Sequence, residues 1–231
     1  MAKSFFELEQ NIKLRVNESS ELTLQSSRIN HKVERFINHT LQLILEKVDR
    51  ADLIEMTYTI TKELAINGVK ANQKRLFFEE SGLDIMNPED YERGVALFKE
   101  AFSDDMNESY GHKLVERGIY VKVNLTYDDT GMCIEVINNT PIMAEEERRL
   151  REKMKKSMGY NDIAEFYMDN MDNTEGAGLG IALIMILMKG AELDPALFRI
   201  YTMPDRTVAR VEIPFTEDYV SKRDQKQASA H

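Results

Sequence analysis

Three polar side chains at helical spacing form the first candidate site in the sequence. Glu63, Asn67 and Lys70 stand at positions i, i+4 and i+7, so in a helix they share one face. Asn67 can offer an amide oxygen to Mg²⁺, and Lys70 can bind a phosphate. Glu63 can orient or deprotonate a water molecule or a hydroxyl group. The stripe suits a magnesium–nucleotide complex, and on spacing alone it is equally compatible with a solvated helix face.

A glycine-rich turn forms the second candidate site. Residues 176–180 read Gly-Ala-Gly-Leu-Gly, and the apolar run 181–188 follows at once. Glycine allows positive φ and close backbone approach, while the first turn of a helix offers unpaired N–H groups and a positive dipole end. The turn is therefore predicted to bind an anion, most simply a phosphate, although the same pattern also occurs in plain turns.

Four segments resemble motifs of the GHKL superfamily, which includes histidine kinases, the gyrase and Hsp90 ATPase domains and serine-kinase anti-sigma factors. The segment 63–70, Glu-Leu-Ala-Ile-Asn-Gly-Val-Lys, resembles the N box, and 176–181 resembles the G2 box. The segment 163–167 looks like the F box of histidine kinases, and 208–214 is similar to the last strand of that domain. The resemblance implies an α+β fold, a Bergerat-type sandwich of a mixed β-sheet with helices on one face.

The resemblance also implies an ATP site with Mg²⁺. Asn67 would hold the metal, Glu63 would be the catalytic base, and Lys70 would approach the phosphates. Residues 143–175 would form a lid over the nucleotide. The hinge of that lid, whose N–H groups meet the phosphates, would be formed by Gly176, Gly178, Leu179 and Gly180.

Residues 138–142, Asn-Asn-Thr-Pro-Ile, depart from the family's G1 box, which normally reads D-x-G-x-G. Asn138 falls where the adenine-reading aspartate would be, both glycines are missing, and the segment is one residue shorter than usual. An asparagine carbonyl can still accept the adenine N6 hydrogen. It does so without the charge assistance that makes such bonds roughly twice as strong. We therefore expect a nucleotide affinity that is reduced, altered in base preference or absent.

Two functions of different classes follow. The first is an ATP-binding, histidine kinase-like or anti-sigma kinase-like signalling protein that transfers a phosphoryl group to a protein partner or regulates it. The second is a catalytically silent GHKL-fold module that regulates a partner by binding. The N and G2 boxes favour the first, while the altered G1 box and the lack of an upstream phosphohistidine hairpin favour the second. An ATPase whose lid drives dimerisation is a third alternative.

These residues need a scaffold, and hydrophobic spacing predicts one of mixed helices and strands. Helices are expected over about 29–48, with Asn30 or Ser27 as N-cap, and from Asp52 through the N box. Alternation predicts two hairpins, 119–127 with 132–137 and 197–201 with 207–213. The further expected elements are edge strands at 11–16 and 21–25, helices after Asn87 and over 105–117, and a helix over 143–157.

The predicted organisation is one domain with additions. Residues 21–214 would form the ATP-binding domain, 1–20 an N-terminal extension, and 215–231 a polar, disordered tail. The helical segment 80–117 has no counterpart in the minimal GHKL domain. It is expected to be either a partner or dimer surface or an extra pair of covering helices.

Composition limits the classes of partner and compartment. A net charge of −10 excludes a general nucleic-acid binder, because no basic excess exists to neutralise phosphates. Cys133 is the only cysteine and lies in an apolar alternation, so it is predicted to be a buried strand residue. The longest apolar run is too short to span a bilayer, and no signal peptide is recognisable. We expect a cytoplasmic protein that acts on a protein partner, with a homodimer as one assembly it could form.

Overall fold

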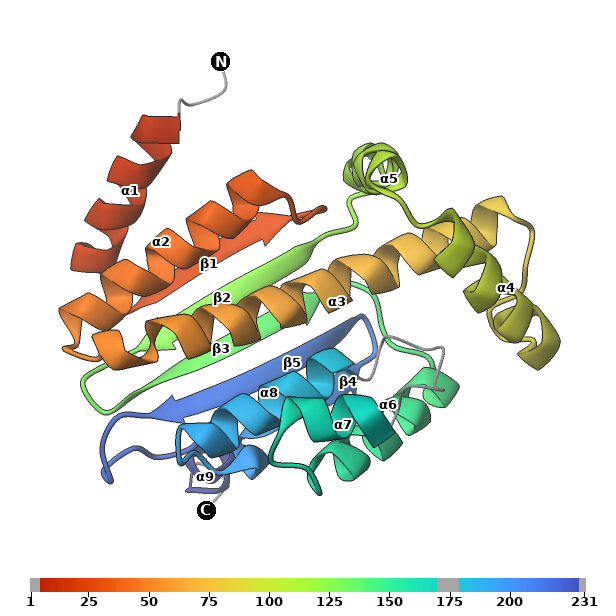
Figure 1. Ribbon diagram of the computed structural model, residues 1–231. Helices are drawn as coiled ribbons and strands as arrows, with labels where there is room; N and C mark the ends of the chain where they lie inside the picture. The colour runs from red at the N-terminus through yellow and green to blue at the C-terminus, as the bar shows by residue number, and fades with distance from the viewer. Residues whose placement is uncertain (1–4, 170–178, 229–231) are drawn as a thin grey trace.

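The computed structural model describes residues 5–169 and 179–228, which form an α+β fold (Figure 1). Its five strands are β1 (Glu21–Ser26), β2 (Val121–Tyr127), β3 (Gly131–Asn138), β4 (Phe198–Met203) and β5 (Arg206–Pro214). Its α-helices are α1 (Phe5–Glu18), α2 (His31–Lys47), α3 (Ile54–Glu80), α4 (Pro88–Ala101), α5 (Asp104–Glu116), α6 (Ala144–Ser157), α7 (Ile163–Asp169), α8 (Leu179–Gly190) and α9 (Lys222–Ala228). Short 3₁₀ turns cover Ala51–Leu53 and Pro195–Leu197.

The sheet is antiparallel throughout the described strands, in the order β1-β2-β3-β5-β4. The prediction of a mixed sheet is therefore wrong. The segment α6–α8 returns the chain so that β4 runs in the same direction as β3. The hairpin partner β5 then lies between them and pairs antiparallel with both. Both predicted hairpins are confirmed. Alternation and turn residues encode this local pairing, but they do not encode the order of the strands in the sheet, in which β5 lies between β3 and β4.

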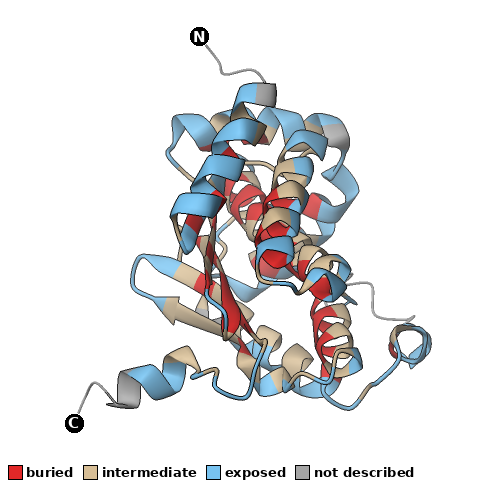
Figure 2. Cartoon of the chain, turned by 90° about the vertical axis from the view of Figure 1, so that its left-hand side faces the viewer, coloured by how far each residue is buried: buried red, intermediate tan, exposed pale blue. Residues whose placement is uncertain are grey.

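Three helices cover one face of the sheet and form the core with it. Buried side chains such as Leu41 of α2, Ile60 of α3 and Ile184 of α8 pack with Ile134 and Val211 of the sheet. Each fully buried aliphatic side chain stabilises the fold by about 1.5–3 kcal/mol. In Figure 2 the buried residues gather where the helices meet the strands. This layer fixes α3 and α8 against the sheet, and these two helices carry Glu63, Asn67 and Lys70 on the one hand and Leu179 and Gly180 on the other.

The first helix differs from the predicted edge strand at 11–16. Residues 5–18 form α1, and the buried Ile12 and Val16 lie at i and i+4 on the face that joins the core. Lys47 of α2 donates a hydrogen bond to the Val16 carbonyl at 2.6 Å. The same apolar residues fit a strand or a helix over so short a window, and packing against α2 decides for the helix.

The two helices that follow begin differently from one another. Asn30 caps α2 as predicted, accepting a hydrogen bond from the Val33 backbone N–H at 3.1 Å. Asp52 does not cap α3, because it lies inside a 3₁₀ turn and pairs with Arg50 at 3.0 Å. α3 then runs for 27 residues and places the N-box residues near its middle.

The predicted helices of the segment 80–117 are confirmed, and they pack on the second half of α3. Asn87 caps α4, and Ser103 caps α5. A Cβ on Gly94 of α4 would lie 2.6 Å from Phe78 Cε1, so the two helices approach closely there. Two exposed ion pairs, Lys113–Glu80 and Arg117–Glu79, join α5 to the end of α3.

The second face of the sheet is partly covered by residues 215–222. The Tyr219 hydroxyl donates to Glu212 Oε2 at 2.9 Å, and the Lys222 backbone N–H donates to the same oxygen at 2.7 Å. The predicted disorder after Pro214 is therefore wrong for residues 215–228, which contain α9. Cys133 lies on this covered face and is buried as predicted, and burial raises the pKa of its thiol to about 12.

Among the described residues, none of the helices has the length and apolar character needed to cross a membrane.

Candidate functional site

The N-box residues lie near the middle of α3, on the side that faces the start of α8. Leu64 and Ile60 are buried in the core and fix the rotation of the helix. That rotation leaves Glu63 and Asn67 partly exposed on one stripe, one turn apart. A carboxylate and a carboxamide therefore project together from a rigid element, as the spacing predicts.

Gly180, in the first turn of α8, brings the glycine-rich motif against that stripe. A Cβ built on Gly180 would lie 2.7 Å from Glu63 Oε2 and 3.3 Å from Asn67 Nδ2. Only a residue without a side chain leaves both groups in place, because any Cβ would push the Glu63 carboxylate aside. Residues far apart in the sequence thus lie side by side, with Gly180 in the first turn of α8 against Glu63 and Asn67 of α3.

The other predicted hinge residues are placed less completely. Leu179 is the first residue of α8 and is 40 % exposed. Gly176 and Gly178 lie outside the described residues, as does the end of the predicted lid. The described part of the predicted lid, residues 143–169, consists mainly of α6 and α7.

Lys70 lies on the same face of α3 as Glu63, two turns away, but its ammonium group has another neighbour. Its Nζ atom lies 5.3 Å from the ring centroid of Phe102, at the junction of α4 and α5. The side chain is exposed. The structure therefore brings Glu63, Asn67 and Gly180 together, while Lys70 contacts the segment 80–117.

Asn138 ends β3 and is buried beside α3. Its Nδ2 atom donates a hydrogen bond to the Gly68 carbonyl at 3.2 Å. Its Oδ1 atom is buried without a hydrogen-bond partner among the described residues. An unpartnered buried carbonyl is costly, by about 1–3 kcal/mol, unless a donor reaches it. Thr207 of β5 lies opposite Asn138 in the register, so this end of the sheet is polar on its core face.

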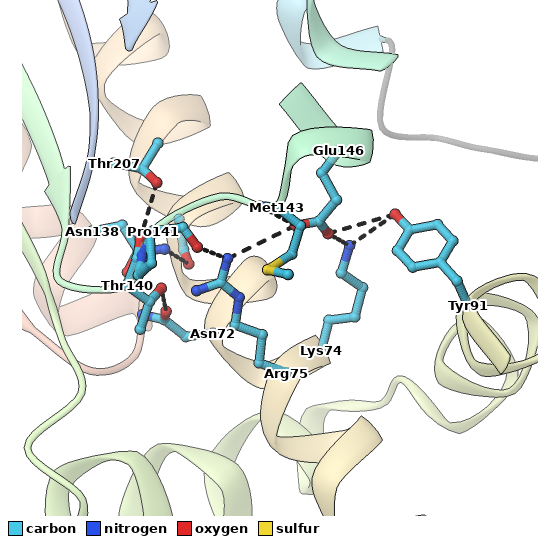
Figure 3. A network of polar contacts seen from close by, with 11 residues as sticks. Asn72, Lys74, Arg75, Tyr91, Asn138, Thr140, Pro141, Met143, Glu146 and Thr207 are labelled. Atoms are coloured by element: carbon cyan, nitrogen blue, oxygen red, sulfur yellow. Dashed lines mark hydrogen bonds and ion pairs between the residues drawn. The ribbon is translucent and has the colours of Figure 1, made fainter. Parts of the chain in front are cut away.

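A network of polar contacts fixes the segment that follows Asn138 (Figure 3). Thr140 donates to Asn72 Oδ1 at 2.9 Å, and Thr207 donates to the Thr140 carbonyl at 3.0 Å. Arg75 donates to the Pro141 carbonyl. The segment 138–142 is therefore tied to α3 and β5 by side-chain hydrogen bonds.

Glu146, in the first turn of α6, joins the same network. It forms ion pairs with Lys74 and, at 3.8 Å, with Arg75, and its side chain is only 10 % exposed. The hydroxyl of Tyr91 on α4 lies 3.5 Å from the same carboxylate. Burial acts to raise the pKa of Glu146, but the two cations outweigh it and hold the pKa below the ordinary value of 4.5. Glu146 thus fastens the start of α6 to α3 and α4 as a carboxylate.

Sequence reasoning missed this cluster. Lys74 and Arg75 continue the same helix as the N box, which is a weak signal. Nothing in the spacing indicates that Glu146, among the charged residues of α6, is the one that turns inward. A buried ion pair between distant elements is visible only once the elements are packed.

The residues present fit a magnesium–nucleotide complex at two places. At the start of α8, Glu63 presents a carboxylate oxygen of the hard type that Mg²⁺ prefers, whereas Asn67 presents its amide nitrogen, so Asn67 would have to turn its amide over to offer an oxygen to the metal. At the end of β3, the Asn138 carbonyl is unpartnered among the described residues but buried, so an amino group would reach it only after its neighbours move aside. Both places lie along α3, which Asn138 contacts at Gly68, the residue after Asn67.

Comparison with known proteins finds a similar protein whose function is not described. An uncharacterized protein of Treponema pallidum (strain Nichols) is 35 % identical to this chain over 180 residues, which is 78 % of the chain. The chain spans about a third of the length of that relative, 35 %. No family model and no solved structure matches the sequence.

Proposed function

We propose that this chain is a GHKL-type ATP-binding domain with a Bergerat-like fold, acting in signalling on a protein partner. One observation carries the proposal. Gly180, the last glycine of the G2-like turn, lies so close to Glu63 and Asn67 of the N-box-like stripe that a Cβ there would contact both side chains.

In this proposal each residue has one task. Asn67 holds Mg²⁺ through its amide oxygen, and the N–H groups at the start of α8 bind phosphate oxygens. The carbonyl of Asn138 accepts a hydrogen from the adenine amino group. A bound nucleotide would supply that donor to an oxygen that is otherwise unpartnered among the described residues.

The chemistry proposed for this site is phosphoryl transfer. Glu63 accepts the proton of an attacking hydroxyl group or water molecule, and positioning with Mg²⁺ electrostatics lowers the barrier. The acceptor hydroxyl or imidazole belongs to a protein partner, such as a response regulator or a component of an anti-sigma pathway. We place this activity in the cytoplasm and allow for a homodimer.

A second candidate function is a module of the same fold that binds a partner without catalysis. It is favoured by Lys70, whose ammonium group lies over Phe102 and is not directed to Glu63 and Asn67. It is also favoured by the short segment 138–142, which Arg75 and Thr207 tie down. In this alternative the nucleotide, where it binds at all, serves as a structural ligand.

Calorimetric titration of Mg·ATP into the wild-type protein tests the proposal. Asn67→Ala removes the predicted metal ligand, and Asn38→Ala, on the exposed surface of α2, is the matched control. We expect binding by the wild type and the control, and a loss of at least tenfold, about 1.4 kcal/mol, for Asn67→Ala. Absence of binding heat from the wild type at millimolar nucleotide refutes the proposal. Equal binding by Asn67→Ala refutes the role of Asn67.

A second assay separates the two candidate functions. Glu63→Gln keeps the shape of the side chain but removes its basicity. We expect it to bind Mg·ATP while hydrolysis of γ-labelled ATP falls by about 10²–10⁴-fold, the usual contribution of a general base. If the wild type binds Mg·ATP and neither hydrolyses it nor transfers its phosphoryl group, the binding module is the better description.

A further inference from the structure

A groove lies between α6 and the edge strand β4, outside the site proposed for the nucleotide. Its volume is about 600 Å³. β4 is the edge strand of the sheet at the end opposite β1. The groove is lined by residues of both elements and by one residue of β5, namely Arg151, Met154, Lys155, Met158, Phe198, Arg199, Ile200, Tyr201 and Arg210.

One wall of the groove is a single face of α6. Arg151, Met154, Lys155 and Met158 are spaced i, i+3, i+4 and i+7, so they form one stripe along the helix. Met158 is 49 % exposed, although it is a large apolar side chain. Methionine adapts its shape to different neighbours, which makes such a stripe suited to contact with a bound chain.

The other wall is the free edge of β4. This strand pairs with β5 on one side, and no described strand pairs with its other side. Four consecutive residues, 198–201, line the groove, and consecutive strand residues point to opposite faces of the sheet. A cavity that reaches both faces must run along the strand edge, where backbone N–H and C=O groups are available for pairing.

The charge of the groove is positive. Arg210 is compensated by Glu212 at 3.3 Å and Glu135 at 4.0 Å. Arg199 donates only to the Ala196 carbonyl, at 3.1 Å, and neither it nor Lys155 has a carboxylate within ion-pair distance among the described residues. No Asp or Glu lines the groove. In a chain of net charge −10, a cationic groove with uncompensated charges favours an acidic occupant.

We propose that this groove binds an extended, acidic peptide segment of a protein partner, which adds to β4 as a sixth strand. Backbone hydrogen bonds to β4 would supply affinity, as in other cases of strand addition. Apolar side chains of the peptide would pack on Met154, Met158 and Ile200, while its carboxylates would pair with Arg199 and Lys155. This surface is distinct from the nucleotide site, so the proposal stands whether or not ATP binds.

Fluorescence polarisation with a labelled ten-residue peptide of alternating glutamate and valine tests the proposal. Two comparison peptides separate the contributions, one with lysine in place of glutamate and one with N-methylated valines that cannot donate backbone hydrogen bonds. We expect the acidic peptide to bind at least tenfold more tightly than either one. Its affinity should fall as salt rises, because the charged side chains are partly exposed.

Charge-reversal variants locate the site on the protein. Lys155→Glu combined with Arg199→Glu should weaken the acidic peptide at least tenfold. The matched control, Lys13→Glu with Lys32→Glu on the exposed surfaces of α1 and α2, should leave binding unchanged. Circular dichroism checks that each variant is folded.

The proposal is overturned by equal binding of the acidic and the basic peptide, by equal binding of the N-methylated peptide, by an unaffected Lys155/Arg199 variant, or by displacement of the peptide by Mg·ATP. The last result would make the groove a nucleotide site. A dimer in light scattering that the Lys155/Arg199 variant abolishes would assign the groove to a second copy of the chain, and would overturn it as well.

Discussion

Replacing Gly180 by alanine is the sharpest test of the convergence between α8 and α3. The new methyl group would lie 2.7 Å from Glu63 Oε2, whereas ordinary contacts of a Cβ begin at 3.4 Å. The carboxylate must therefore move by about 0.7 Å (3.4 minus 2.7), and Asn67 Nδ2 by about 0.1 Å. Functional groups need placement to within about 0.5 Å, so the shift exceeds the tolerance of a preorganised site.

Stability and binding should respond to this substitution in opposite directions. Glu63 is the flexible end of a side chain, so it can move aside at little cost. Alanine meanwhile favours the helix over glycine by roughly 0.5–1 kcal/mol. We expect an unchanged or slightly raised melting temperature, together with a loss of about tenfold in affinity for Mg·ATP, which is about 1.4 kcal/mol.

Gly190→Ala provides the matched control at the other end of the same helix. A Cβ at Gly190 would meet nothing within 4 Å. It tests the general effect of a glycine-to-alanine change in α8 without touching α3. Calorimetry and thermal unfolding of the two variants measure both quantities. If Gly180→Ala binds Mg·ATP as tightly as Gly190→Ala, the close approach of α8 has no part in binding and our reasoning fails.

Three further predictions concern stability and reactivity. At pH 8 native Cys133 should react with a thiol reagent roughly a thousandfold more slowly than in the unfolded chain. Its pKa of about 12 lies about 3 units above the ordinary thiol value of 9.0, so the reactive thiolate is rarer by that factor. Comparable rates in the two states would contradict its burial. Glu146→Gln should destabilise the protein by about 3 kcal/mol at pH 7 in urea unfolding, because Lys74 loses its buried partner. Since the folded pKa of Glu146 lies below the unfolded value, this difference should be complete above pH 4.5 and shrink as the pH falls through the folded pKa; a difference that grows with acid would refute it. Gly94→Ala should cost about 1–3 kcal/mol, because its methyl group would lie 2.6 Å from Phe78 Cε1 and closer still to Cζ. An unchanged melting temperature would show that α4 does not pack there.

Local signals in the sequence predict most of the elements. Asn30 and Asn87 cap the helices that follow them, and alternation with Pro204 and Asp205 between the strands predicts the last hairpin. Such signals are encoded within a few residues, so they can be recognised without knowledge of the packing. The helix at 5–18 is different, because Ile12 and Val16 become a helix face only through their contact with α2.

In the candidate site, too, some features follow from local spacing in the sequence and others only from tertiary packing. The helical spacing of Glu63 and Asn67 predicts that they share a face, and the structure places them on it. That Gly180 meets them, that Lys70 turns to Phe102 and that Glu146 turns inward are results of tertiary packing. Side chains of this length reach several neighbours, and the fold of the whole chain selects among them.

The length of α3 has a mechanical consequence. At 27 residues the helix is roughly 40 Å long, and it carries Glu63 and Asn67 midway while α4 and α5 grip its far end. A continuous helix of this kind moves as one rigid body, so a rotation at one end is transmitted along its length. Turning the far end by about 20° would sweep a side chain about 6 Å from the axis through about 2 Å at the site. A partner that binds the segment 80–117 and rotates α3 would therefore also move Glu63 and Asn67.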